Sequence, residues 1–251
     1  MDHPFGIDFG GTGIKGAPVD LGRGDFAHDR VRIDTPKPAD PQSVAKVFQQ
    51  IVDSFPASSS PVGVTVPGIV RRGVVLSAAN IDKSWIGEDA DAIFTEALGR
   101  EVHVVNDADA AGLAEAEYGA AKGRQGLVMV ITLGTGIGSA MIWDGQLVPN
   151  SEMGHLELDG AVAEVTTATS AREREGLTWE AWSERLTKYF RHLDRLFTPD
   201  LFVIGGGVSK SWEKFGHLIE VETEMVPATL QNRAGIVGAA LVAHRKAGSE
   251  D

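Results

Sequence analysis

The 251-residue chain contains no cysteine, which excludes disulfide bonds, cysteine–zinc sites and thiol catalysis and fits a reducing compartment. No apolar run approaches the roughly 18 residues of a membrane-spanning helix, and Asp2, His3 and Pro4 stand where a signal peptide would begin. Basic residues are few, with 23 Lys and Arg against 35 Asp and Glu and a formal net charge of −12. Nucleic-acid-binding proteins normally have the opposite balance. We therefore expect a soluble cytoplasmic protein that acts on a small molecule.

A glycine-rich stretch, DFGGTGIKG, occupies residues 8–16. Read from its second glycine, it matches the G-x-G-x-x-G pattern of dinucleotide-binding turns, but such a turn must lead into a helix. Here Pro18 blocks a helix interior and Asp20 is a turn residue, so the glycines should lie between two strands. The P-loop pattern is absent as well. The stretch is predicted to be a β-hairpin tip whose glycines let backbone N–H groups approach phosphate.

The same pattern recurs in ITLGTGIGSAMIWDG, residues 131–145. With one glycine skipped, the two copies align on identical residues: Ile7, Gly10, Thr12, Gly13, Ile14 and Ala17 fall on Ile131, Gly134, Thr135, Gly136, Ile137 and Ala140. Two such hairpins indicate two similar halves, although ordinary glycine-rich hairpins could match by chance. The duplication resembles the actin-like ATPase (ribonuclease H-like) superfamily, which implies an α/β fold of two domains with a central cleft. Because a carboxylate repels phosphate, Asp8 is expected to hold Mg²⁺ through water.

Alternating strand and helix patterns predict an α/β protein. Residues 40–55 predict a helix with Asp40 as its N-cap, and residues 178–197 predict a longer helix capped by Thr178. We expect a smaller N-terminal domain over residues 1–107 and a larger one over 108–234. A final helix, residues 235–248, is expected to pack back on the first domain.

Two polar groups are candidates for chemistry. Asn106 and Asp107 stand where a predicted strand ends and a helix begins, the usual position of ligands at α/β sheets. An ionised Asp107 could accept a hydroxyl proton during phosphoryl transfer, or it could be only an N-cap. The SEMGH loop, residues 151–155, brings together a carboxylate and an imidazole that can bind sugar hydroxyls. Taken alone, such loop residues are usually solvated surface.

Six motifs in this order resemble the ROK family of sugar kinases and sugar-responsive repressors: DFGGTGIKG, NDADAAGLAE, LGTGIGS, SEMGH, VIGGGVS and AGIVGAA. The stretches SAANIDKSW, residues 77–85, and NDADAAGLAEAEYGA, residues 106–120, are most similar to the branch of the family that phosphorylates glucose with polyphosphate. The resemblance implies transfer of a phosphoryl group from polyphosphate or ATP to the 6-hydroxyl of glucose, with Mg²⁺ as cofactor, by a homodimer. Many ROK proteins carry a zinc-binding cysteine cluster, which this chain lacks, so we expect no zinc.

The resemblance also implies a role for each candidate residue. Asp107 would be the general base on the sugar. The residues that would hold the sugar are Asn80, Asn106, Asp107, Glu152, His155 and Glu164. Those that would meet the phosphate chain or the nucleotide are Gly10, Gly11, Thr12, Lys15, Gly134, Thr135, Gly136, Gly205, Gly206 and Gly207.

Three alternatives stay open. A strictly ATP-dependent glucokinase or another hexose kinase of the family would share the motifs. A sugar-sensing repressor would need a DNA-binding segment ahead of the first hairpin. The net charge of −12 of this chain would also oppose DNA binding. A chaperone-like ATPase would lack the sugar residues.

Overall fold

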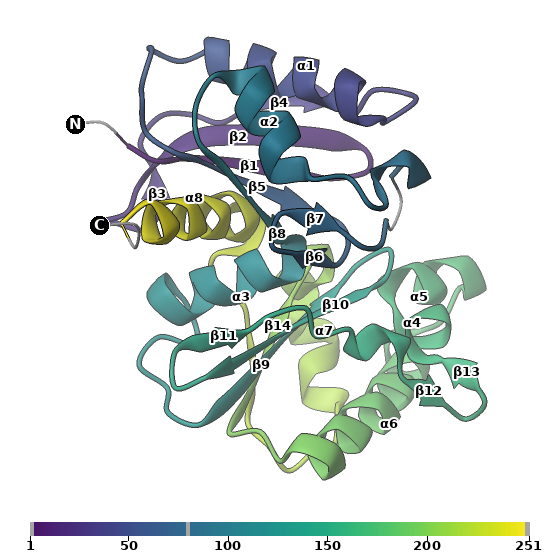
Figure 1. Ribbon diagram of the computed structural model, residues 1–251. Helices are drawn as coiled ribbons and strands as arrows, with labels where there is room; N and C mark the ends of the chain where they lie inside the picture. Colours follow the sequence, from purple (N-terminus) through teal and green to yellow (C-terminus); the bar gives the residue numbers. More distant parts are fainter. Residues whose placement is uncertain (1–2, 79–80, 249–251) are drawn as a thin grey trace. The chain divides into compact units, whose positions relative to one another are not determined.

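The computed structural model describes residues 3–78 and 81–248, and the chain forms two compact units (Figure 1). Unit 1 consists of Met1–Ala114 and Arg233–Asp251, and unit 2 of Glu115–Asn232. The division falls inside helix α3 (Asp107–Tyr118), whereas the sequence places it at residue 107. With its C-terminal segment, unit 1 spans more residues than unit 2. Within the described residues no helix is long and apolar enough to cross a membrane.

Unit 1 is built on a sheet that has six strands among the described residues, in the order β3-β2-β1-β5-β8, with β4 also paired to β2. Strands β1, β5 and β8 are parallel, and β2 runs antiparallel to β1. The strands of unit 1 are β1 (Phe5–Phe9), β2 (Gly13–Asp20), β3 (Asp25–Phe26), β4 (Val31–Asp34), β5 (Val62–Val66), β6 (Val70–Arg71), β7 (Val74–Val75) and β8 (Val102–Asn106). Its helices, apart from α3, are α1 (Pro41–Asp53), the 3₁₀ helix η1 (Lys83–Trp85), α2 (Ala90–Leu98) and α8 (Ala234–Ala247).

Unit 2 is built on a second sheet in the order β11-β10-β9-β14-β15. Its strands are β9 (Leu127–Leu133), β10 (Ile137–Trp143), β11 (Gln146–Val148), β12 (Glu157–Leu158), β13 (Ala161–Val162), β14 (Leu201–Gly205) and β15 (Met225–Pro227). Its α-helices are α4 (Ala163–Thr167), α5 (Thr169–Glu175), α6 (Trp179–Phe197) and α7 (Trp212–Phe215). The 3₁₀ helices are η2 (Met153–His155), η3 (Gly207–Ser211), η4 (Gly216–Leu218) and η5 (Gln231–Arg233), which ends in unit 1.

The two helices predicted with their caps are confirmed. The Asp40 carboxylate accepts the Ser43 N–H at 3.0 Å, and Pro41 is the first residue of α1. The Thr178 hydroxyl accepts the Ala181 N–H at 3.2 Å at the start of α6. Both helices bury one apolar face: Phe48 of α1 packs near Phe9 and Phe94, and Phe190 of α6 packs near Phe202.

The buried side chain of Glu115, in α3, bonds to the turn at Ala120 and to the segment at Thr229 and Leu230. Its carboxylate accepts N–H groups from Ala120 at 2.8 Å, Thr229 at 3.2 Å and Leu230 at 2.7 Å, as well as the Thr229 hydroxyl at 3.1 Å. The side chain is 1% exposed. These donors supply the hydrogen bonds without which burial of the carboxyl group would cost free energy.

Helix α8 packs on β1, β5 and β8. Against β1 and β5 the backbones approach so closely that only glycine fits. A Cβ atom on Gly6 would overlap the Ile236 carbonyl, and one on Gly63 would overlap the Ala239 carbonyl. On the other side of the contact, a Cβ on Gly238 of α8 would overlap the Ala110 carbonyl of α3. The backbone of α8 therefore lies directly on the sheet of unit 1 and against α3.

We expect Gly63→Ala to lower the free energy of unfolding by about 1–3 kcal/mol, because the new methyl group must push α8 away from β5. Chemical denaturation measures this change. Gly248→Ala, at the end of α8, is the matched control, since its methyl group meets only ordinary contacts. Equal stabilities for the two variants would contradict the close packing of α8.

Candidate active site

The first glycine hairpin joins β1 and β2, with Asp8 opposite Lys15 and Phe9 opposite Ile14. The Gly10 N–H donates to the Gly13 carbonyl at 3.2 Å and closes the loop. Gly11 and Thr12 are exposed at its tip. The prediction of a strand–loop–strand hairpin instead of a dinucleotide-binding turn is thus confirmed.

The carbonyl groups of this loop bond to β4 and the residue that follows it. The Gly10 carbonyl accepts the Thr35 hydroxyl at 2.5 Å. The Thr12 carbonyl accepts the Arg32 guanidinium at 3.3 Å and the Thr35 N–H at 3.5 Å. These bonds anchor the loop on one side and leave its tip accessible.

Asp8 lies at the base of the hairpin within a small polar network. Its carboxylate pairs with the Lys15 ammonium at 3.3 Å and accepts the Thr65 hydroxyl at 3.2 Å. A Cβ on Gly235, in the first turn of α8, would lie 3.0 Å from an Asp8 oxygen, so the helix N-terminus closely approaches this carboxylate. Lys15, predicted to meet phosphate, is therefore paired with Asp8 in this structure.

Asp8 fits the way that proteins bind Mg²⁺. Magnesium usually keeps several waters and takes one or two carboxylates plus substrate phosphates, instead of an all-protein cage. Among the described residues, no group of three or more His, Asp or Glu could hold a metal by itself. Asp8 is half-buried next to the exposed hairpin tip, as a carboxylate that holds the ion through water should be.

The second hairpin joins β9 and β10 and repeats the bonding of the first. The Gly134 N–H donates to the Gly136 carbonyl at 3.0 Å, as Gly10 does to Gly13. The carbonyls of Gly134 and Thr135 accept the N–H and the hydroxyl of Ser170, at 3.1 Å and 2.6 Å. The repetition inferred from the sequence therefore extends to the hydrogen bonds of the two loops.

Asn106 and Asp107 lie at the end of β8 and the start of α3, as predicted. Asn106 is buried, and its side-chain oxygen accepts the Asp109 N–H at 3.0 Å, which is the bond of an N-cap residue. Its amide group donates to the Gly68 carbonyl at 3.0 Å. Asn106, rather than Asp107, therefore caps α3. Asp107 is the exposed first residue of the helix, where its carboxylate accepts the Ala108 N–H at 2.9 Å.

Glu152, His155 and Glu164 come together within unit 2. The two ring nitrogens of His155 lie 3.7 Å from Glu152 and 3.6 Å from Glu164, and the ring itself is exposed. The other carboxylate oxygen of Glu164 accepts the Ile137 N–H at 3.2 Å, so this cluster is attached to the second hairpin. Two carboxylates and an imidazole at such spacing can accept from and donate to several sugar hydroxyls.

Ser139 and Ser151 position the SEMGH loop, and sequence reasoning missed both. The Ser139 hydroxyl donates to the Ser151 carbonyl at 2.7 Å and accepts the Met153 N–H at 2.9 Å. The Ser151 hydroxyl returns a bond to the Ser139 carbonyl at 3.0 Å. Only the serine within the SEMGH motif could have been noticed, since nothing local in the sequence pairs it with β10.

The three glycines at the end of β14 and just beyond it, Gly205, Gly206 and Gly207, form a bend with distinct parts. Gly206 has φ of 82°, and a Cβ atom there would overlap the backbone of Leu133. A Cβ on Gly207 would meet nothing within 4 Å. Gly206 is therefore required by backbone geometry, whereas Gly207 faces open space.

Asn80, the remaining sugar-binding candidate, lies outside the described residues.

A family model described as the ROK family matches residues 4–176. This chain belongs to the ROK family. It is 50% identical over 240 residues to a polyphosphate glucokinase of Mycobacterium tuberculosis (strain CDC 1551 / Oshkosh), a match that covers 95% of this chain and 90% of that protein. A polyphosphate glucokinase of Mycobacterium leprae (strain TN) is 48% identical, over 94% of this chain and 73% of that protein.

Solved structures agree with this assignment. The inorganic polyphosphate/ATP-glucomannokinase from Arthrobacter sp. strain KM superposes with a TM-score of 0.93 at 54% identity, over 98% of this chain and 100% of that one. A ROK family glucokinase from Streptomyces griseus, in complex with glucose and AMPPNP, has a TM-score of 0.82 at 24% identity, over 96% and 99% of the two chains. The second likeness concerns the fold alone. The predicted actin-like ATPase fold is confirmed by these matches.

The half-buried Glu152 generates a prediction about pH. Burial raises the pKa of its carboxyl above the ordinary value, the His155 ring opposes this change, and the Glu164 carboxylate adds to it. Between the unfolded and the folded pKa the native state holds more protons, so wild-type stability falls as the pH rises through this window. Glu152→Gln removes that loss. The variant should therefore gain Tm relative to wild type at pH 7 but not at pH 4.

Thermal unfolding at the two pH values checks this expectation. Glu157→Gln is the control, because Glu157 is exposed in the same segment. A Tm difference independent of pH would refute the assigned cause.

Proposed function

We propose that this protein transfers a phosphoryl group from inorganic polyphosphate, and also from ATP, to the 6-hydroxyl of glucose. The observation that carries the proposal is the 50% identity, over 95% of the chain, to proteins named polyphosphate glucokinase. The 54% identical structure, named a polyphosphate/ATP-glucomannokinase, supports the use of both donors. In the reaction, the sugar 6-oxygen forms a bond to the terminal phosphorus, the bond to the next phosphate breaks, and the hydroxyl proton goes to a base.

Asp107 is the proposed base. Asp107 is exposed at the N-terminus of α3, where the helix dipole favours an ionised carboxylate. The alternative role of Asp107 was that of N-cap, but Asn106 makes the capping bond of this helix. An ionised carboxylate within reach of a hydroxyl can accept its proton as the oxygen attacks. Glu152, His155 and Glu164 would bind sugar hydroxyls within unit 2, a role that rests on the family resemblance.

Each loop is proposed to bind phosphate at its own exposed tip, formed by Gly11 and Thr12 in unit 1 and by Thr135 in unit 2. Backbone N–H groups in glycine loops bind anionic oxygens without a cationic side chain. Mg²⁺ would be held through water by Asp8 and would neutralise part of the phosphate charge. A homodimer and a cytoplasmic location stay predictions, the first from the resemblance and the second from the composition.

Asp107→Asn keeps the size of the side chain but removes the base. We expect kcat to fall about 10²- to 10⁴-fold, while the glucose Kd measured by calorimetry changes little. Asp89→Asn is the matched control, because Asp89 also starts a helix in unit 1 and asparagine can replace it as an N-cap. Near-normal turnover of Asp107→Asn would rule out this mechanism.

The identity of the phosphoryl donor is tested by comparing polyphosphate with ATP in the same assay. With Mg²⁺ and glucose, polyphosphate should give glucose 6-phosphate with a kcat/KM at least comparable to that with ATP. None of the loop groups named above recognises a base or a ribose, so Thr12→Val should impair both donors together. If polyphosphate gives no product in a nucleotide-free assay while ATP does give product, the protein is a strictly ATP-dependent glucokinase, the alternative candidate.

A further inference from the structure

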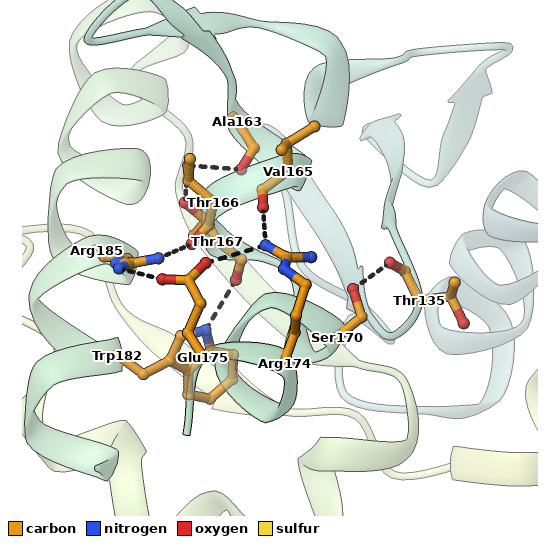
Figure 2. Close-up of polar contacts among 10 residues, drawn as sticks. All are labelled: Thr135, Ala163, Val165, Thr166, Thr167, Ser170, Arg174, Glu175, Trp182 and Arg185. Carbon is orange, nitrogen blue, oxygen red and sulfur yellow. Dashed lines mark hydrogen bonds and ion pairs between the residues drawn. The ribbon is translucent and has the colours of Figure 1, made fainter. Parts of the chain in front are cut away.

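The short helix α5 bonds at one end to the second glycine hairpin (Figure 2). Ser170, near its start, donates its N–H to the Gly134 carbonyl at 3.1 Å and its hydroxyl to the Thr135 carbonyl at 2.6 Å. One residue thus holds two consecutive carbonyls of the loop.

These two bonds determine where the loop directs its N–H groups. In a trans peptide the C=O and the following N–H point in opposite directions. With the Gly134 and Thr135 carbonyls turned towards Ser170, the N–H groups of Thr135 and Gly136 must point away from α5. Within the part of the chain that the structure describes, neither N–H donates a hydrogen bond to the protein. They are therefore oriented and available for an anion.

At its other end, α5 bonds to α4, which carries Glu164. The last carbonyls of α4 each accept a side-chain donor: Val165 from Arg174 at 2.8 Å, Thr166 from Arg185 at 2.8 Å, and Thr167 from the Trp182 indole at 2.9 Å. Figure 2 shows these three donors around the end of α4. Such bonds satisfy carbonyls that a helix C-terminus leaves unpaired.

Glu175, the last residue of α5, joins the two arginines. Its carboxylate accepts Arg174 at 3.0 Å and Arg185 at 2.7 Å, and these bonds hold its pKa below the ordinary value. Arg174, Glu175 and Arg185 form one connected group that links α5, α6 and the end of α4 (Figure 2). The orientation of α4, and with it the position of Glu164, depends on this group.

We propose that α5 is a positioning bracket that couples the donor-phosphate loop to the sugar-binding carboxylate within unit 2. The proposal rests on the proposed function and adds two sets of positioning residues to it. Ser170 orients the N–H groups that receive the donor, and the Arg174–Glu175–Arg185 group orients Glu164 for the sugar. None of these side chains needs to touch a substrate.

The first hairpin provides independent support, because it is held in the same way. The Thr35 hydroxyl binds the Gly10 carbonyl, and Thr35 N–H and Arg32 bind the Thr12 carbonyl. A hydroxyl residue distant in sequence therefore turns loop carbonyls inward in both units. In each loop one residue binds two carbonyls, one through its hydroxyl and one through its N–H, although the two donors are exchanged between the loops. This recurrence indicates that carbonyl anchoring is a requirement of the loop.

Ser170→Ala tests the loop end of the bracket. Losing the hydroxyl should lower kcat/KM for both donors about fivefold, while the glucose Kd without donor stays within about twofold of wild type. Ser170→Thr retains a hydroxyl and should restore the donor kcat/KM. Ser54→Ala is the matched control, since Ser54 also donates to a carbonyl, that of Gln50 at 2.8 Å, and lies outside the site. Unchanged donor kinetics in Ser170→Ala would overturn this end of the bracket.

The double variant Arg174→Gln/Arg185→Gln tests the sugar end. The glucose Kd should rise about tenfold, with the donor KM at saturating glucose unchanged. Arg124→Gln/Arg191→Gln is the matched control, because both arginines form exposed ion pairs in unit 2, with Glu224 and Glu220. An equal effect of the two double variants on glucose binding would overturn the sugar end.

Amide hydrogen exchange separates failure of the bracket from failure of the proposed function. If wild type transfers no phosphoryl group from either donor, the proposed function is wrong, and exchange still tests the bracket. The bonded N–H groups of Gly134 and Ile137 should exchange about fivefold faster in Ser170→Ala than in wild type or Ser170→Thr. Unchanged exchange at both amides would refute the bracket whatever the activity.

Discussion

A peptide group that offers its N–H to an anion must turn its carbonyl the other way, and both glycine hairpins are organised around this constraint. The loop carbonyls bond inward, to Thr35 and Arg32 in unit 1 and to Ser170 in unit 2. Each loop is closed by a bond between its own residues, Gly10 to Gly13 and Gly134 to Gly136. The anchoring segments and the exposed tips are arranged as this requirement demands.

The same constraint explains how so acidic a protein could bind a polyanion. The cations next to the first loop are already paired, Lys15 with Asp8 and Arg32 with Asp34. Binding would therefore depend on oriented backbone dipoles and on the metal ion that a polyphosphate brings with it. Local geometry, rather than the net charge of −12, decides this interaction.

Near the residues predicted to bind sugar, neighbouring side chains satisfy the helix ends. Asn106 caps α3 and thereby releases Asp107 from capping. Arg174, Arg185 and Trp182 cap the end of α4, and Glu164 at its beginning bonds to Ile137 of the hairpin. In unit 2 the supporting residues lie outside the six motifs, whereas in unit 1 the cap Asn106 is itself one of the predicted site residues.

The sequence alone determined the features that depend on local rules. Apolar periodicity and capping residues gave the helices at Pro41–Asp53 and Trp179–Phe197, and repeated glycines gave the two hairpins. The family resemblance also placed Glu152, His155 and Glu164 in one group, which the structure brings together. Tertiary structure decided what depends on distant partners: Thr35 lies 25 residues from the carbonyl it holds, and Ser170 lies 35 residues from Thr135. Packing likewise decided that the division between the units falls inside α3. Hydrogen bonds such as that from Asn106 to the Gly68 carbonyl decided that Asn106 is the cap. A short sequence pattern cannot specify which of two adjacent polar residues is buried.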